Sequence, residues 1–188
     1  MHDTTSLRRA CQADPFIRRY FLDVYGADQV PCQPASYPRC AIANTDPIDL
    51  PGQHWVALFW SAPGQGDFFD SYAIPPQRFR PRWQCVRAFQ QSPHPIQQWS
   101  SDVCGDYALY YLYHRCRGTP LTRIVHYFSP SNLLYNDTAV VERMHELFPS
   151  LMSEKHVGGH LFDARGRSQI CIQRHRHRCY APCQKKAI

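Results

Sequence analysis

The stretch from Trp55 to Trp60 constrains the fold more than any other part of the chain. Six apolar residues follow one another there, and Ser61-Ala62-Pro63-Gly64 ends the run. A continuous apolar run of this length between turn signals is typical of a strand buried on both faces. The segment from Phe68 to Tyr72 supplies a return strand. We therefore predict a β-hairpin in the middle of the fold.

Other segments add helices and one more strand. The run Cys40-Ala41-Ile42-Ala43 is strand-like, and Asp14-Pro15 resembles an N-cap with proline at the first helical position. We expect a short helix from Phe16 to Phe21 that ends by Gly26. Further helices are expected at 82–90, at 105–116, and at 137–148, the last capped by Asn136 or Asp137. This mixture indicates an α+β fold with a central mixed sheet and the helix at 105–116 packed against it.

Length and composition are those of a single globular domain. The chain has 188 residues, of which 44% are apolar and 13% aromatic, and a domain of this size buries roughly 70% of the surface of its unfolded chain. No apolar run approaches the roughly 20 residues that span a bilayer, and the start of the chain has no basic-then-apolar signal pattern. We therefore expect a soluble, intracellular protein with no membrane association.

The positive charge is concentrated at the end of the chain. The net charge is +6, and residues 155–188 hold eight Lys or Arg against Asp163 as the one acid. We predict a folded domain over 1–153 and a basic, flexible tail over 154–188. The alternation of Arg174, Arg176 and Arg178 with histidine favours non-specific phosphate binding to DNA or RNA. A zinc site is the alternative, with the ligand types supplied by Cys171, His175, His177, Cys179 and Cys183.

The nine cysteines form no Cys-x-x-Cys pair, and an odd number leaves at least one thiol unpaired. In a reducing compartment most of them are expected to be small buried hydrophobic residues. Cys104 differs because Ser100-Ser101-Asp102 before it can cap a helix and the residues after Gly105 are helix-forming. Unpaired backbone N–H groups at a helix N-terminus stabilise a thiolate. Cys104 is therefore the candidate nucleophile, against the alternative of a buried structural cysteine.

A thiol nucleophile needs a base, and the base needs an acceptor that fixes its tautomer. His54 lies just before the buried strand, and Asp70 lies in the return strand. The midpoint between them is residue 62, inside the predicted turn, so antiparallel pairing brings both to the same end of the sheet. Each residue taken singly also fits a plain structural role.

An oxyanion donor is expected in the loop before Cys104. Gln98 lies six residues before the cysteine and can turn its amide N–H toward the developing oxyanion, beside the Cys104 backbone N–H. Gln97 could do the same, and we take Gln98 as the candidate.

The order His54, Asp70, Gln98, Cys104 resembles adenain, the adenovirus cysteine protease, and more distantly the SUMO-specific proteases. The resemblance spans about residues 12 to 130. It includes Tyr-Phe-Leu-x-x-Tyr at 20–25 and Cys-Ala-Ile-x-Asn-Thr at 40–45. Adenain has Glu at the third position and a spacing that Gln97 would match, whereas Asp70 and Gln98 are similar to the SUMO-protease pattern. That mixture resembles proteases of Maverick/Polinton elements and their viral relatives.

The resemblance implies a cysteine endopeptidase that cleaves viral or element-encoded precursor or capsid proteins near glycines, as in virion maturation. It also implies activation by DNA or by a short peptide bound through a cysteine outside the active site. For Cys116 we favour a core role over that one. We expect a monomer that needs no cofactor for its chemistry, located in a host nucleus or virion. The alternatives are a deconjugating protease for a ubiquitin-like modifier and an inactive, nucleic-acid-binding relative.

Overall fold

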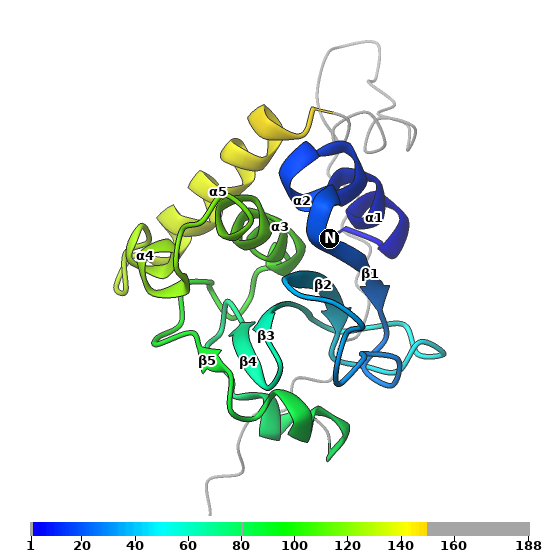
Figure 1. Cartoon of the computed structure of the whole chain (residues 1–188). Helices are drawn as coiled ribbons and strands as arrows, with labels where there is room; N and C mark the ends of the chain where they lie inside the picture. Colours follow the sequence, from blue (N-terminus) through cyan, green and yellow to red (C-terminus); the bar gives the residue numbers. More distant parts are fainter. Residues whose placement is uncertain (1, 80, 150–188) are drawn as a thin grey trace, which may run out of the picture. The chain divides into compact units, whose positions relative to one another are not determined.

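A five-stranded sheet with helices packed on it forms the fold (Figure 1). The computed structural model describes residues 2–79 and 81–149. The strands are β1 (Phe21–Tyr25), β2 (Arg39–Asn44), β3 (Trp55–Ala62), β4 (Gln65–Phe69) and β5 (Gln90–Gln91). The helices are α1 (Thr4–Ala13), α2 (Pro15–Tyr20), α3 (Cys104–Arg115), α4 (Leu121–His126) and α5 (Leu133–Leu147), with 3-10 turns at Pro76–Arg78 and Pro81–Val86.

The sheet is mixed, as the sequence predicted. Its strand order is β1-β2-β3-β4-β5. The two outer pairs, β1 with β2 and β4 with β5, are parallel, and the two inner pairs are antiparallel. The predicted hairpin is confirmed, because Leu58 faces Phe68 and Ala62 faces Gln65 across the turn. The fold is thus α+β, with β3 at the centre of the sheet.

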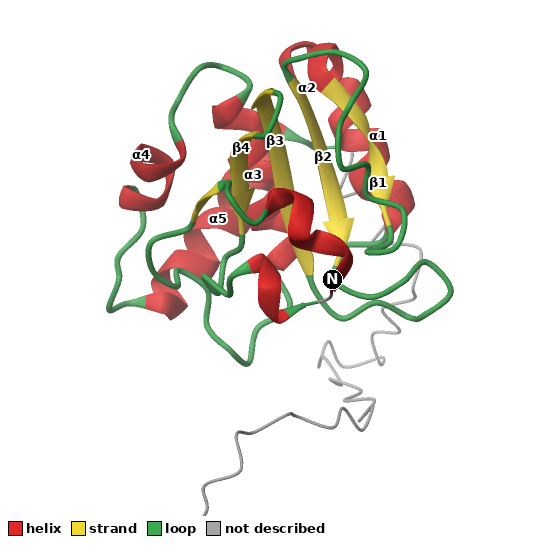
Figure 2. Ribbon diagram, turned by 60° about the horizontal axis from the view of Figure 1, so that its bottom comes forward, coloured by secondary structure: helices red, strands yellow, loops and turns green. Residues whose placement is uncertain are grey.

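Both faces of β3 are buried from Trp55 to Trp60, which explains why that stretch is apolar throughout. One face, with Trp55, Ala57 and Phe59, packs in the larger core with α1 and the helices from α3 onward. The other face, with Val56, Leu58 and Trp60, packs in a second core that includes Trp83 and Phe89. Figure 2 shows α1 and α3 on one side of the sheet and the 3-10 segment on the other. Alternation of side chains along a strand sends successive residues to these two cores.

Helix α3 covers the centre of the sheet and is almost entirely buried along its first half. Tyr107, Leu109, Tyr111 and Leu112 are inaccessible to solvent. Two of its polar side chains contact a buried carboxylate of β4: the Tyr111 hydroxyl donates to Asp67 Oδ2 at 2.8 Å, and Arg115 Nε donates to the same oxygen. These contacts hold the helix against β4, so its N-terminus has a fixed position relative to the strand ends.

The first 25 residues differ from the prediction. The short helix is α2, with Asp14 accepting hydrogen bonds from the backbone N–H groups of Phe16 and Ile17 as expected of an N-cap. It does not continue toward Gly26, because residues 21–25 form β1 in parallel with β2. The backbone N–H and C=O groups of residues 21–25 are satisfied by pairing with β2. No pattern within residues 16–26 predicts that pairing. Helix α1 was not predicted.

Two other boundaries were also wrong. The last described helix begins at Leu133 with Asn132 as its N-cap, so Asn136 and Asp137 lie inside it, where both are buried. In place of capping, the Asn136 amide donates to the Ile96 carbonyl of the preceding loop, and Asp137 accepts from the Tyr107 hydroxyl of α3. Residues 82–90 contribute only a 3-10 turn before β5.

The six described cysteines fall into two groups. Cys11, Cys40, Cys104 and Cys116 are buried free thiols, which places Cys116 in the core as expected. Cys32 and Cys85, also expected to be reduced, are joined in a disulfide with Cα atoms 5.3 Å apart. They lie 53 residues apart in the sequence, so only the tertiary fold brings them together. The other three cysteines belong to the tail, which lies outside the described residues together with the calls made on it.

Over residues 2–79 and 81–149, no helix has the length and apolar character needed to cross a bilayer.

Candidate active site

His54 is held in place by the turn that leads into β3. Its backbone carbonyl accepts from the Thr45 N–H at 2.9 Å. Before it, Gly52 has a φ of +80°, and a Cβ there would lie 2.5 Å from Asn44 Nδ2. A side chain at position 52 would therefore clash as well as strain the backbone. The Asn44 side chain also accepts from the Gln53 N–H at 3.2 Å, a second contact that holds the turn just before the histidine.

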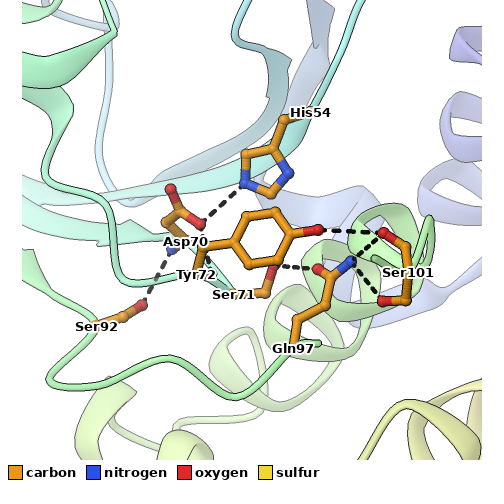
Figure 3. A network of polar contacts seen from close by, with 7 residues as sticks. All are labelled: His54, Asp70, Ser71, Tyr72, Ser92, Gln97 and Ser101. Atoms are coloured by element: carbon orange, nitrogen blue, oxygen red, sulfur yellow. Dashed lines mark hydrogen bonds and ion pairs between the residues drawn. The ribbon is translucent and has the colours of Figure 1, made fainter. Parts of the chain in front are cut away.

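Asp70 follows the last residue of β4 and contacts the histidine directly. His54 Nε2 and Asp70 Oδ1 are 2.9 Å apart, as seen in Figure 3. Both residues are buried, Asp70 being only 1% exposed. The Asp70 N–H donates to Ser92 Oγ at 3.1 Å, which fixes the backbone at this corner. The hairpin therefore brings the two residues together at one end of the sheet. The predicted return strand ends at Phe69, and residues 70–73 form a turn instead.

The charge balance around His54 favours its protonated form. Burial lowers the pKa of the imidazole, but the hydrogen bond to Asp70, the interaction with the Cys104 sulfur and the negative charges of both outweigh it, raising the pKa to about 9. The other ring nitrogen, Nδ1, is buried and makes no hydrogen bond to any described residue. With Nε2 held by Asp70, Nδ1 is the atom available to the sulfur.

Cys104 is the first residue of α3, so its sulfur lies at the N-terminus of a 12-residue helix. The predicted cap is wrong: Val103 is the N-cap residue and makes no side-chain cap hydrogen bond. The Ser101 hydroxyl donates instead to the Gln98 carbonyl at 3.0 Å. The Val103 side chain therefore accepts no hydrogen bond from the backbone N–H groups of the first turn. These N–H groups point toward the N-terminal end of the helix, where the Cys104 sulfur lies.

The next residue, Gly105, is closely packed against the start of the chain. A Cβ at Gly105 would lie 3.1 Å from His2 Cδ2 and 3.4 Å from Trp55 Cδ1. His2 Nε2 lies 2.7 Å from Asp106 Oδ1, in a pair that is almost fully buried. This pair fastens the N-terminal segment to the first turn of α3. No motif in the sequence indicated it, because the two residues are 104 positions apart.

The two candidate glutamines have different surroundings. Gln97 is inaccessible to solvent; its Oε1 accepts from Ser71 Oγ at 2.6 Å, and its Nε2 donates to the carbonyl and hydroxyl of Ser101. Both N–H groups of that amide are therefore in use. Gln98 is half-buried, and its Nε2 donates to Ser100 Oγ at 3.0 Å. One N–H of Gln98 thus has no acceptor in the described part of the chain.

A pocket of about 280 Å³ lies next to the turn that precedes His54, and none of the candidate catalytic side chains lines it. It borders the His54 turn and the N-terminal segment, and Ile48 and Leu50 expose roughly half of their side chains next to it. Its lining includes His2, Asn44, Ile48, Leu50, Gly52 and Trp55. No group of three or more His, Cys, Asp or Glu side chains suited to a metal ion occurs within residues 2–79 and 81–149.

No family model matches the chain, and no curated protein matches it. Among solved structures, it is similar to the crystal structure of the ASFV pS273R protease, with 17% sequence identity and a TM-score of 0.49. The match covers 71% of this chain and 64% of that one, so the chain spans less than two thirds of that protein.

The raised pKa of His54 can be measured directly by NMR titration of the histidine ring signals. His54 should hold its proton until about pH 9. In Asp70→Asn the acceptor charge is removed, so burial should pull the midpoint well below 9. His114, whose pKa burial lowers, is the internal control and should titrate at the same low pH in both proteins. A wild-type midpoint near 6.5 would contradict the pairing of His54 with Asp70.

Proposed function

We propose that the protein is a cysteine endopeptidase in which Cys104 is the nucleophile, His54 the general acid and base, and Asp70 the residue that orients His54. The observation that carries this proposal is the buried His54–Asp70 pair, with the second ring nitrogen available to a sulfur at a helix N-terminus. A protonated imidazole beside a thiolate is the ion pair from which thiol nucleophiles act.

The reaction is acyl transfer to water. The Cys104 thiolate attacks the peptide carbonyl, and the oxyanion is held by the Cys104 backbone N–H and by the Gln98 amide. His54 gives its proton to the leaving amine, and the C–N bond breaks to leave a thioester. His54 then takes a proton from water, which attacks the thioester and releases the acid and the thiolate.

For substrates, we propose protein chains cut near glycines, such as precursor or capsid proteins, on the strength of the resemblance to adenain. The pocket beside Trp55 supports the binding of a part of the substrate away from the scissile bond, because it adjoins the His54 turn at Gly52 while none of the reacting side chains lines it. A deconjugating protease for a ubiquitin-like modifier would use the same chemistry. An inactive scaffold would not need the buried ion pair, since a buried charge pair costs free energy to desolvate.

The main experiment compares the wild type with Cys104→Ala on three substrates: peptides containing Gly-Gly, folded modifier conjugates, and a peptide without glycine. The wild type should cut the Gly-Gly peptides, and Cys104→Ala should abolish cutting with little effect on folding, because a small side chain is lost. Cys116→Ala, which removes a buried thiol outside the site, is the matched control. Cleavage of conjugates alone would favour deconjugation, and cleavage that persists in Cys104→Ala would overturn the assignment.

Gln98 and Gln97 are separated by a pair of substitutions. Losing an oxyanion donor costs roughly 3 kcal/mol, so Gln98→Ala should lower kcat by about a hundredfold. Gln97→Ala should instead lower the free energy of unfolding, measured in urea, because Ser71 and Ser101 lose a buried partner. Its kcat should fall by about tenfold at most, because the loop before Cys104 loses contacts to Ser71 and Ser101, and thus by less than in Gln98→Ala. The reverse pattern would assign the oxyanion to Gln97.

We also propose that residues 155–188 bind DNA or RNA without sequence preference and that DNA activates cleavage through them. The net charge of +7 in this segment supports the proposal. If about six phosphates are neutralised, affinity should fall roughly a thousandfold between 50 and 200 mM salt. Deleting 155–188 should remove both this affinity and any stimulation by DNA while leaving basal peptide cleavage intact. An unchanged affinity and salt slope would place binding elsewhere.

A further inference from the structure

Tyr72 contacts both the His54–Asp70 pair at the sheet end and Ser101 in the loop before Cys104. Its backbone N–H donates to Asp70 Oδ1 at 2.7 Å, the same oxygen that contacts His54. Its ring lies 4.8 Å from the His54 ring, centroid to centroid, with the planes inclined by 31°. Its hydroxyl donates to the Ser101 carbonyl at 3.2 Å. Figure 3 shows the ring between the His54–Asp70 pair and Ser101.

The site needs such a connection because its two halves belong to different elements. His54 and Asp70 lie at the ends of β3 and β4, whereas Cys104 follows the loop of residues 97–103 that also carries the candidate oxyanion donor. The distance between sulfur and imidazole depends on how this loop sits against the sheet. A displacement of about 1 Å at a reacting centre can cost a hundredfold in rate. Tyr72 hydrogen-bonds to the loop and to the sheet end at once.

The backbone around Tyr72 is held in an unusual conformation. Ala73 has a φ of +55°, in the left-handed region that residues with a Cβ seldom adopt. Its N–H donates to the Asp70 carbonyl at 3.0 Å, which closes a turn over residues 70–73. This turn directs the Tyr72 ring back over His54. Strain of this kind persists where surrounding contacts hold it, and it is concentrated at functional sites.

The Tyr72 hydroxyl remains a hydrogen-bond donor across the working pH range. Burial and the negative charges of Cys104, Asp137, Asp70 and Asp102 raise the pKa of the phenol. An ionised phenolate could not donate to the Ser101 carbonyl. Cys104 and Asp70 are both close enough to the Tyr72 phenol for their negative charges to raise its pKa.

Trp99 covers the ring of Tyr72. The two rings stack with centroids 4.6 Å apart and planes 5° from parallel. Trp99 itself is 65% exposed, so it is not part of either core. It belongs to the same loop as Gln98 and Ser101, so the stack is a second contact between Tyr72 and the loop that precedes Cys104. The stack also keeps water from one face of Tyr72 beside the His54–Asp70 pair.

We propose that Tyr72 is the positioning residue of the site: through its hydroxyl and its stack with Trp99 it sets the loop of residues 97–103, and hence Cys104, against His54. This inference rests on the proposed function, since it assigns Cys104 and His54 as the reacting pair. Nothing in the local sequence around Asp70-Ser71-Tyr72 indicates the role, because the hydroxyl's partner is 29 residues away.

The test uses four variants of the full chain. Tyr72→Phe removes only the hydroxyl, and Tyr72→Ala removes the ring as well. Trp99→Ala removes the ring that stacks on Tyr72, whereas Trp99→Phe keeps an aromatic ring there. Tyr135→Phe is the matched control, because Tyr135 is 65% exposed and its hydroxyl makes no described hydrogen bond. Two rates are measured well below each protein's unfolding temperature: peptide cleavage, resolved into kcat and KM, and site-mapped alkylation of Cys104 by iodoacetamide across pH 5 to 10.

Tyr72→Phe should lower kcat about fivefold to tenfold with KM unchanged, as expected for one lost hydrogen bond. Tyr72→Ala should lower it about a hundredfold and shift the pH profile of Cys104 alkylation toward higher pH, because the thiolate loses its alignment with the imidazolium. Trp99→Ala should also lower kcat, and Trp99→Phe should keep most of the wild-type kcat because it keeps a ring stacked on Tyr72. A purely structural role would lower the unfolding temperature without moving the alkylation profile of the folded protein.

The inference is overturned if Tyr72→Phe and Tyr72→Ala match Tyr135→Phe in kcat and in the alkylation profile, or if their losses lie in KM alone. The proposed function fails separately, if the wild type cleaves none of the substrates. In that case the alkylation profile of Cys104 still decides whether Tyr72 sets the thiol against His54.

Discussion

Strand β3 is buried on both faces from Trp55 to Trp60, and its packing sets the positions of the elements around it. Because one face packs under α3 and the other under the 3-10 segment, the strand can neither slip nor rotate without exposing apolar surface. Its register with β4 is thereby set, and the strand ends are set with it. His54 and Asp70 lie at those ends, so their contact is a consequence of core packing. The chemistry of the site begins with this hairpin.

Electrostatics then decides which form the histidine takes. Burial alone would keep His54 neutral, because a desolvated imidazolium is unfavourable. The Asp70 carboxylate and the Cys104 sulfur supply enough negative charge to reverse that preference. The site is therefore a cluster in which each charge is tolerated only because of the others. Removing Asp70 or Cys104 would leave the remaining members less well matched to their surroundings.

The loop of residues 97–103 is bound to the sheet end by polar contacts and by the stack of Trp99 on Tyr72. Gln97 is buried between Ser71 and Ser101, and Tyr72 reaches the same Ser101 carbonyl. Hydrogen bonds depend on direction more than apolar contacts do, so this arrangement fixes orientation as well as distance. An oxyanion donor and a nucleophile on one loop require that kind of precision. Thus the apolar cores set where the elements lie, and the polar network sets how the reacting groups point.

Patterns among neighbouring residues predict the central hairpin and the helix that begins at the nucleophile. The apolar run from Trp55, its turn and its return strand predicted the hairpin, and hence the meeting of His54 with Asp70. The aromatic helix placed Cys104 at its start. The parallel pairing of β1, the Cys32–Cys85 disulfide and the place of Tyr72 beside Ser101 emerge only in the folded chain. Hairpins and helices follow from local periodicity, whereas these contacts join residues 18 to 53 positions apart, whose meeting depends on how the whole core packs.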